Sequence, residues 1–490
     1  MTDPKVRARY TPTIGIECHV QLKTKSKLFS AVGNDAREAP PNTLVSHIDF
    51  GLPGALPFLN GEAVRLACKA AFALGTEPER FSKFDRKHYF YPDLPKGYQI
   101  SQYDQPIIGK GAITIEVDGA EKTIGITRAH MEEDAGKSTH PAGKDYSLVD
   151  LNRAGTPLLE IVSEPDMHTA AEAKAYAREL YLRMRYADVS DADLYYGNMR
   201  FDVNVSVSKT DELGTRSETK NLNSFRSVER AVEYEIDRQI ELLENGERVV
   251  QETRGWDDAK QATFSQRSKE NAEDYRYMPD PDLPPIVLDE KFIADLKKEM
   301  PTMPDEWRRR LSGLGVDNDV IELLIDTQAD IPDVKYLEFI EKNLSNAEFA
   351  TWVTNRVVNV VEPLRPKIGT KQFIRMEWAD YFPAIYELTK SGKLSSTKEK
   401  VLMENLLRES EFPQDVEKYA VQKGLIQVSD EGEIAKIVEK VLGENAKAAE
   451  DVKNGEMKAI GFLVGQVMKQ SQGKANPQMA QELIKKQLGL

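Results

Sequence analysis

Strand patterns in this chain of 490 residues are confined to its first part. Alternating apolar and polar side chains recur at 13–22, 112–117, 123–127 and 201–207. Helical periodicity covers 169–185 and 227–245, and beyond Lys291 it is the only pattern that remains. A part that mixes strands with helices, followed by a part with helices alone, is typical of an α+β protein. We therefore predict an α+β protein in which a mixed α/β domain precedes an all-helical part.

Two breaks divide the chain, which is too long for one hydrophobic core. The segment 278–285 is rich in proline, and the helical pattern changes again near Pro413. The predicted domains are a mixed catalytic-sized domain at 1–292, a helical domain at 293–412 and a small helical tail at 413–490.

The composition limits where this protein can be and what it can bind. No apolar run reaches membrane-spanning length, and the first residues lack the apolar core of a secretory signal. Two cysteines, Cys18 and Cys68, are too few for a disulfide scaffold or a four-thiolate zinc site. We expect a cytoplasmic protein without membrane contact.

The formal net charge of −14 argues against a general nucleic-acid coat. From Lys453 onward, however, the sequence contains six lysines and only two acidic residues, Glu456 and Glu482. A basic tail on an acidic body is able to touch RNA, although solvated lysines that serve no ligand would give the same pattern.

An aromatic and cationic run covers 84–103 and contains four tyrosines. Pro92 and Pro95 exclude a helix through its middle. An ordered loop of this kind suits a phosphorylated or nucleotide ligand, which it would hold by stacking and charge. The alternative is a lid whose rings only pack on the domain beneath.

The segment 131–138 ends like a phosphate-binding loop, but Met131 stands where the first glycine belongs and three acids fill the loop. What the chain offers is a distributed set of carboxylates. Glu17 and His19 share one face of a predicted strand, and the other members are Glu132, Glu133, Glu160, Asp202 and Glu218. Oxygen ligands with one imidazole suit magnesium or manganese better than zinc. Each acid taken singly is also compatible with an ordinary solvated surface position.

Ten motifs, in order along nearly the whole chain, match one family. They lie at 14–22, 51–57, 84–103, 132–137, 150–166, 220–225, 251–254, 274–277, 461–466 and 473–477. The chain resembles the B subunit of the bacterial aspartyl/glutamyl-tRNA(Asn/Gln) amidotransferase, the GatB family, with its YqeY-like tail.

The resemblance implies a cradle-like catalytic domain and a glutamine-hydrolysing carbon–nitrogen ligase. In a heterotrimer with an amidase (the A subunit) and a small protein (the C subunit), the B subunit would use ATP and Mg²⁺ or Mn²⁺. It would phosphorylate the side-chain carboxylate of Glu-tRNA(Gln), Asp-tRNA(Asn) or both. Ammonia supplied by the amidase would then displace the phosphate.

The resemblance also implies roles for single residues. The metal ligands would be Glu17, His19, Glu133, Glu160, Asp202 and Glu218, of which His19, Glu133 and Glu160 would form the catalytic group. Glu17, Asp202 and Glu218 would serve ATP, together with Lys87, Lys96, Tyr89 and Tyr91 of the aromatic loop. Lys458, Lys469 and Lys474 of the tail would bind tRNA.

Three departures from the family pattern matter, and two of them concern metals and buried thiols. Ser30, Ser46 and Asp49 stand where many relatives carry zinc-binding cysteines, so we expect no zinc. Cys18 stands where relatives usually have an aliphatic residue. It points away from the face of its two neighbours, and we expect a small buried apolar side chain there.

The third departure is that Tyr195 and Tyr196 replace two carboxylates near Asp202, which raises the alternative of a tRNA-binding scaffold that has lost catalysis. Retention of the other acids argues against that alternative, because crowded carboxylates destabilise a fold unless a cation offsets their repulsion. The added helical domains argue against a free-standing ligase for a small amino acid.

Overall fold

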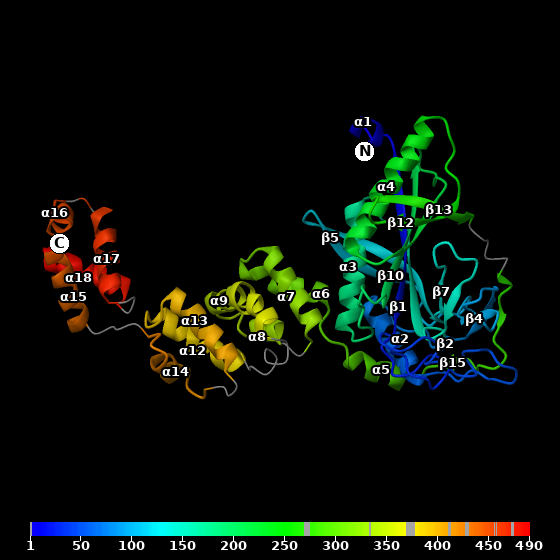
Figure 1. Cartoon of the computed structure of the whole chain (residues 1–490), viewed down its shortest axis with the longest axis horizontal. Helices are drawn as coiled ribbons and strands as arrows, with labels where there is room; N and C mark the ends of the chain where they lie inside the picture. The colour runs from blue at the N-terminus through cyan, green and yellow to red at the C-terminus, as the bar shows by residue number, and fades with distance from the viewer. Residues whose placement is uncertain are drawn as a thin grey trace. The chain divides into compact units, whose positions relative to one another are not determined.

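The computed structural model describes residues 2–268, 275–332, 335–368, 378–409, 413–426, 431–454, 456, 458–471 and 475–490. The chain forms two compact units, Met1–Glu306 and Trp307–Leu490, and each is described by itself. Within the described residues, all strands lie in the first unit, and the second unit is helical (Figure 1). The predicted α+β class is confirmed. The three-domain division remains a prediction.

The first unit contains fifteen strands among its described residues. They are β1 (Thr11–Gln21), β2 (Phe81–Ser82), β3 (Asp85–His88), β4 (Tyr98–Ser101), β5 (Gly111–Val117), β6 (Ala120–Glu133), β7 (Lys137–Thr139), β8 (Leu148–Asp150), β9 (Pro157–Ser163), β10 (Met199–Ser208), β11 (Ser217–Leu222), β12 (Glu252–Asp257), β13 (Ala262–Ser268), β14 (Met278–Pro279) and β15 (Ile286–Val287). Its helices are α1 (Pro4–Arg7), α2 (Gly61–Ala73), α3 (Ala170–Tyr186), α4 (Phe225–Glu244) and α5 (Glu290–Lys298), and α6 (Pro304–Leu311) crosses into the second unit.

Eight strands form the main sheet in the order β13-β12-β11-β10-β1-β9-β6-β5. Strand β1 lies inside the sheet, antiparallel to both β10 and β9. The pair β11 and β12 is parallel, whereas the other pairs are antiparallel. All four predicted strands are found, and β6 is longer than predicted because it continues to Glu133.

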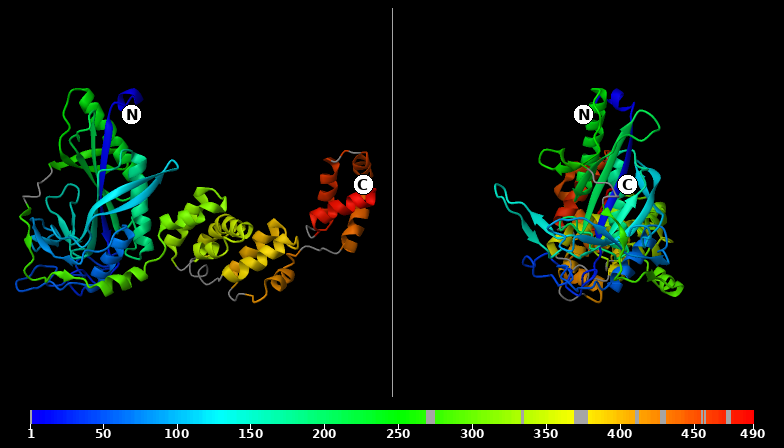
Figure 2. Two further views of the ribbon diagram at one scale, coloured as in Figure 1. Left: turned by 180° about the vertical axis from the view of Figure 1, so that it is seen from behind. Right: turned by 90° about the vertical axis from the view of Figure 1, so that its right-hand side faces the viewer.

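Helices α3 and α4 lie side by side along one face of this sheet (Figures 1 and 2). Strand β1 buries every second side chain, namely Ile14, Ile16, Cys18 and Val20. Cys18 is thus a buried apolar residue, as expected. Because side chains alternate along a strand, the intervening Glu17 and His19 emerge on the opposite face.

Helix α3 begins one residue after the predicted start, and α4 begins two residues before it. Thr169 caps α3, since its Oγ1 accepts a hydrogen bond from Glu172 N at 3.1 Å. Ser224 caps α4 in the same way by accepting from Ser227 N at 3.0 Å. These caps satisfy amide groups that the first helical turn leaves without partners.

The described residues also form three smaller sheets with the orders β14-β3-β4, β15-β2 and β7-β8, and β4 packs against β6 of the main sheet. The aromatic loop connects β3 to β4, and its proline-containing part forms turns rather than a helix. The first unit therefore covers one sheet face with helices and lines the other with short strands and loops.

The second unit contains α7 (Asn318–Asp330), α8 (Tyr336–Lys342), α9 (Ala347–Arg356), α10 (Arg365–Ile368), α12 (Trp378–Lys390), α13 (Ser396–Arg408), α14 (Val416–Gln422), α15 (Glu431–Glu444), α16 (Ala446–Lys453), α17 (Lys458–Gln470) and α18 (Pro477–Leu488). Helices α15 to α18 share a core that includes Ile434, Val438, Leu463, Val467 and Ile484. None of the helices in the described parts of the chain is both long and apolar enough to cross a membrane.

A buried carboxylate ties α4 to the sheet. Glu235 accepts hydrogen bonds from Ser217 at 2.6 Å and from Arg238 at 2.7 Å, and it also accepts one from Thr263. Arg254 Nε lies 3.1 Å from its Oε1. Burial alone would raise the pKa of Glu235, but its hydrogen-bonded partners prevail and lower it.

We predict that Glu235→Gln lowers the free energy of unfolding by about 3 kcal/mol at neutral pH, because it breaks a buried charge pair. A lowered carboxyl pKa stabilises the fold above the unfolded pKa and ceases to do so as the pH falls through the folded pKa. Urea unfolding should therefore show a smaller deficit in acid than at neutral pH. Glu241→Gln, at an exposed position of the same helix, is the control. An equal loss from both variants would contradict the assignment.

Candidate functional site

The sheet register brings the predicted ligands together on the face opposite α3 and α4. Glu17 of β1 lies opposite Asp202 of β10, and His19 lies opposite Glu160 of β9. His130 of β6 lies on the other side of Glu160. Four neighbouring strands thus present ionisable side chains in one row, although the residues come from distant parts of the sequence.

A first cluster consists of His19, Glu132 and Glu160, whose ligand atoms all lie within 4.8 Å of one another. His19 Nε2 is 3.3 Å from Glu160 Oε2 and 3.7 Å from Glu132 Oε1. These side chains are buried or half-buried. The geometry would let one cation contact all three at once.

His130 stands behind this cluster and was not among the predicted residues. Its Nε2 lies 3.6 Å from Glu132 and 3.7 Å from Glu160, and its buried Nδ1 has no hydrogen-bond partner among the described residues. The signal that could have found it is the alternation of His130 and Glu132, the same spacing as in Glu17 and His19.

Glu133 lies outside the cluster, although it was the predicted ligand. Its carboxylate forms an ion pair with Lys96 and accepts a hydrogen bond from Ile100 N at 2.9 Å. Adjacent strand residues point to opposite faces. The structure therefore places Glu132, rather than Glu133, beside His19 and Glu160.

A second cluster consists of Glu17, Asp202 and Glu218, whose ligand atoms also lie within 4.8 Å of one another. Lys220 Nζ lies 3.0 Å from Asp202 and 3.5 Å from Glu218. Asn204 Nδ2 donates to Glu17 at 3.1 Å. All three predicted acids meet here.

The first cluster carries a proton at neutral pH. Burial favours the neutral imidazole of His19, but its hydrogen bond with Glu160 and the nearby carboxylates raise its pKa to about 9. Burial likewise opposes ionisation of Glu160, yet the adjacent His130 and His19 hold the pKa of this carboxyl well below its usual value. A metal ion that binds His19 has to displace its proton.

The second cluster is strained by like charges. Burial, followed by the charges of Glu160, Glu218 and Asp202, raises the pKa of Glu17. Lys220 offsets only part of this repulsion, since one ammonium faces three carboxylates. A bound divalent cation would remove the remaining repulsion.

The donor types fit hard divalent cations. The first cluster would supply two carboxylates and one imidazole, and the second would supply three carboxylates. Oxygen-rich sites of this kind suit Mg²⁺ or Mn²⁺, whereas zinc sites in proteins favour sulfur and nitrogen ligands.

The aromatic loop borders the first cluster. Lys87 lies half-buried with its Nζ 5.8 Å from the ring centre of Tyr89, and the rings of Tyr89 and Tyr91 lie 5.9 Å apart. Lys96 reaches Glu133 and lies with its Nζ 5.7 Å from the ring centre of Tyr98. Of the predicted loop cations, Lys87 is the one on which the charges of Glu132 and Glu160 of the first cluster act, and they help to raise its pKa.

The two tyrosines that depart from the family pattern stay away from the acids. Tyr195 and Tyr196 are 87% and 54% exposed, and Asp193 fixes their turn by accepting from both amide groups. Asp202 keeps its place in the second cluster because its strand position is set by β1. The side chains of Tyr195 and Tyr196 are therefore exposed to solvent, and Asp202 still meets Glu17 and Glu218.

Ser30, Ser46 and Asp49, the residues at the positions of the zinc-binding cysteines, form a hydrogen-bonded group. The buried Asp49 accepts from Ser30 Oγ at 3.2 Å and from Ser46 N at 2.7 Å. Lys27 Nζ lies 3.6 Å from this carboxylate and is fully buried. A salt bridge with hydrogen bonds thus holds this loop.

In the tail, Lys458 and Lys469 lie exposed on α17. Lys474, the third predicted tRNA-binding lysine, lies outside the described residues. The structure thus provides two exposed cations on one helix.

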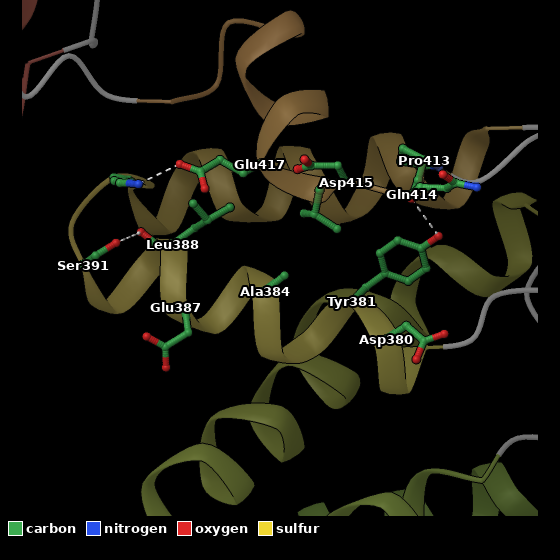
Figure 3. A pocket seen from close by; sticks show the side chains of 12 residues that line it. Asp380, Tyr381, Ala384, Glu387, Leu388, Ser391, Pro413, Gln414, Asp415 and Glu417 are labelled. Atoms are coloured by element: carbon green, nitrogen blue, oxygen red, sulfur yellow. Dashed lines mark hydrogen bonds and ion pairs between the residues drawn. The ribbon is translucent and has the colours of Figure 1, made fainter.

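A hollow of 810 Å³ lies between α12 and α14 in the second unit (Figure 3). Four carboxylates line it, from Asp380, Glu387, Asp415 and Glu417, while its Lys393 is paired with Glu417 at 2.7 Å. Because its lining is negative, this hollow would repel phosphate. We therefore do not assign it as the nucleotide site.

Comparisons with known proteins agree with this geometry. Residues 12–294 match the family described as the GatB/GatE catalytic domain, and 335–488 match the family described as the GatB domain. These matches define the class: a catalytic domain joined to the C-terminal domain of the same kind of protein.

Three full-length relatives are each named as the B subunit of an aspartyl/glutamyl-tRNA(Asn/Gln) amidotransferase. Those of Carboxydothermus hydrogenoformans, Bdellovibrio bacteriovorus and Thermotoga sp. are 44%, 43% and 41% identical, and each comparison covers 98% of this chain and 99% of the relative. The chain belongs to the family of aspartyl/glutamyl-tRNA(Asn/Gln) amidotransferase B subunits. The resemblance found in the sequence is thereby confirmed.

We predict that Glu132→Gln weakens Mn²⁺ binding by about tenfold or more, because it removes a charged ligand atom. Glu133→Gln should leave Mn²⁺ affinity near that of the wild type, since Glu133 faces Lys96. Titration followed by electron paramagnetic resonance of free Mn²⁺ measures both. Glu121→Gln, at an exposed position of the same strand, is the control. Loss of Mn²⁺ in Glu133→Gln alone would show that the ligand is the residue predicted from the sequence.

Proposed function

We propose that this chain activates and amidates the aminoacyl group in a glutamine-hydrolysing tRNA amidotransferase, a carbon–nitrogen ligase. Its substrates would be Glu-tRNA(Gln), Asp-tRNA(Asn) or both, with ATP as phosphoryl donor. The observation that carries the proposal is the pair of clusters built around Glu17 and His19 on one open strand face. Two such clusters side by side suit a reaction that brings a phosphate chain to a carboxylate.

In this proposal His19, Glu132 and Glu160 hold one divalent cation, and Glu17, Asp202 and Glu218 hold another with the nucleotide. When bound, such cations neutralise phosphate charge and position the transferred group. Lys220 holds Asp202 and Glu218 in place through contacts of 3.0 and 3.5 Å. The carboxylate oxygen of the aminoacyl group would attack the γ-phosphorus of ATP, breaking its bond to the bridging oxygen and releasing ADP.

Ammonia would then attack the carbonyl carbon of the acyl phosphate, forming the amide and expelling phosphate. An amidase, the A subunit, would supply that ammonia from glutamine, and the small C subunit would complete the heterotrimer. The name of the relatives, which designates them as B subunits, supports an assembly of several different chains. The cytoplasm, where tRNA is charged, is the proposed location.

The alternative of a scaffold without catalysis gains no support from the described residues. A decayed site would be expected to lose some of its metal-ligand candidates, but all six are present. Five of the six lie together in the two clusters, namely Glu17, His19, Glu160, Asp202 and Glu218. Tyr195 and Tyr196, which suggested the alternative, are exposed side chains of a turn.

We predict that the heterotrimer, reconstituted with its amidase and its small third chain, amidates misacylated tRNA only with Mg²⁺ or Mn²⁺, and that zinc chelators leave its activity unchanged. The reason is the oxygen-rich donor set of the two clusters.

We also predict that His19→Ala abolishes amidation while tRNA affinity stays near that of the wild type. Amidation assays and filter binding on both misacylated tRNAs test this. Stoichiometric zinc that is lost together with activity, or loss of tRNA binding in a folded His19→Ala complex, would refute it.

The tail would hold the body of the tRNA. The proposal rests on Lys458 and Lys469, which are exposed on α17, and includes Lys474 by sequence alone. Lysine contacts to phosphate position an RNA without reading its sequence.

The double variant Lys458→Gln with Lys469→Gln should therefore raise the KM for tRNA more than it lowers kcat. The slope of log affinity against log salt should fall by about one unit per lost contact. Lys440→Gln, an exposed lysine of α15 near Glu444, is the matched control. An unchanged salt slope in the double variant would show that these lysines are only solvated.

A further inference from the structure

Lys87 of β3 lies in an enclosure of tyrosine rings. Its Nζ lies 4.8 Å from the ring centre of Tyr275 and 5.8 Å from that of Tyr89. An ammonium over aromatic faces is attracted by the ring quadrupole, and the rings remove water from around it. We call Tyr89, Tyr103, Tyr275 and Tyr277 the tyrosine enclosure.

Three segments build the enclosure. Tyr103, two residues after the end of β4, stacks on Tyr277 with ring centres 4.1 Å apart and planes inclined by 12°. Tyr277 meets Tyr275 edge to face at 6.2 Å, and Tyr275 meets Tyr89 at 6.1 Å. The four rings thus form one connected chain of contacts beside Lys87.

Arg276, which lies between Tyr275 and Tyr277 in the sequence, adopts an unusual backbone conformation. Its φ is 45°, in the left-handed region that non-glycine residues rarely adopt. His88, next to Lys87, donates from Nδ1 to the carbonyl oxygen of Arg276 at 3.0 Å. Met278 then pairs with Arg86 in the ladder of β14 and β3. A strained conformation persists only where its surroundings fix it, and His88 supplies one such contact.

The ammonium of Lys87 makes no hydrogen bond and no ion pair with any of the described residues. Glu132 and Glu160 act on its charge from beyond ion-pair distance. A lysine carries three donors. A poorly solvated ammonium with unused donors, within electrostatic reach of Glu132 and Glu160, is suited to an anion.

The local charges indicate which anion. The second cluster, with its three acids and Lys220, would take the phosphate chain together with a metal ion. A short monoanionic side chain that approaches Glu132 and Glu160 meets repulsion, which one adjacent ammonium offsets. Aromatic walls also keep water away from a reactive acyl group.

We propose that Lys87 and the tyrosine enclosure bind the side-chain carboxylate of the aminoacyl group, and that His88 is a positioning residue that holds the enclosure closed. This proposal rests on the proposed function. It adds a substrate subsite, the chemical group that fills it, and a role for His88, Tyr275 and Tyr277.

The direct test compares two ligands that differ in charge at the reacting group, Glu-tRNA(Gln) and Gln-tRNA(Gln). The wild-type complex should bind the first at least about tenfold more tightly, as expected for a charge-assisted hydrogen bond. Lys87→Gln should remove this preference and leave the KM for ATP unchanged. Lys110→Gln, an exposed lysine of the same unit, should keep the preference. A preference retained in Lys87→Gln, or a raised KM for ATP with unchanged tRNA discrimination, would overturn the proposal.

The role of His88 is tested by conservative rescue. His88→Ala should raise the KM for the aminoacyl-tRNA and lower its preference for the charged ligand, with an unchanged Tm. His88→Gln, whose amide also donates to a carbonyl, should restore both. Equal behaviour of the two variants would show that the hydrogen bond to Arg276 positions nothing.

A wild-type complex that does not amidate refutes the proposed function. A complex that amidates but binds the two tRNAs equally well leaves the proposed function standing and refutes the carboxylate subsite.

Discussion

The pairing of β1 between β9 and β10 is the constraint on which the rest of the site depends. Its buried residues, such as Ile16 and Cys18, fix which side chains face α3 and α4. A shift of one residue would bury Glu17 and His19 and expose the core, so the hydrophobic effect itself sets the register. The geometry of both clusters is thus a consequence of core packing on the other face of the same strand.

The open face concentrates ionisable groups whose pKa values are shifted by burial and by one another. The raised pKa of Glu17 reflects burial and neighbouring carboxylates, and the raised pKa of His19 reflects Glu160 beside it. Groups with perturbed pKa values at one place are a common property of functional sites. Two lysines offset part of this negative charge. Lys220 does so by ion pairs with Asp202 and Glu218. Lys87 forms no ion pair with any described residue.

The sequence predicted the fold class because strand alternation is confined to the first part of the chain, where it is mixed with helical periodicity, whereas beyond Lys291 helical periodicity alone remains. It also predicted that Glu17 and His19 share a face, since they lie on one strand. It could not select between Glu132 and Glu133, because that choice depends on where the alternation of β6 starts relative to its bulge beside β9. His130 was missed for the same reason. The tyrosine enclosure joins segments nearly 190 residues apart, which no local pattern encodes.

The central claim is that the face of β1 opposite the helices holds two divalent cations. Crystals of the assembled complex soaked in Mn²⁺ would test it by anomalous diffraction. The account predicts two peaks, one among His19, Glu132 and Glu160 and one among Glu17, Asp202 and Glu218. Peaks elsewhere on the chain, with these two places empty at saturating Mn²⁺, would contradict it.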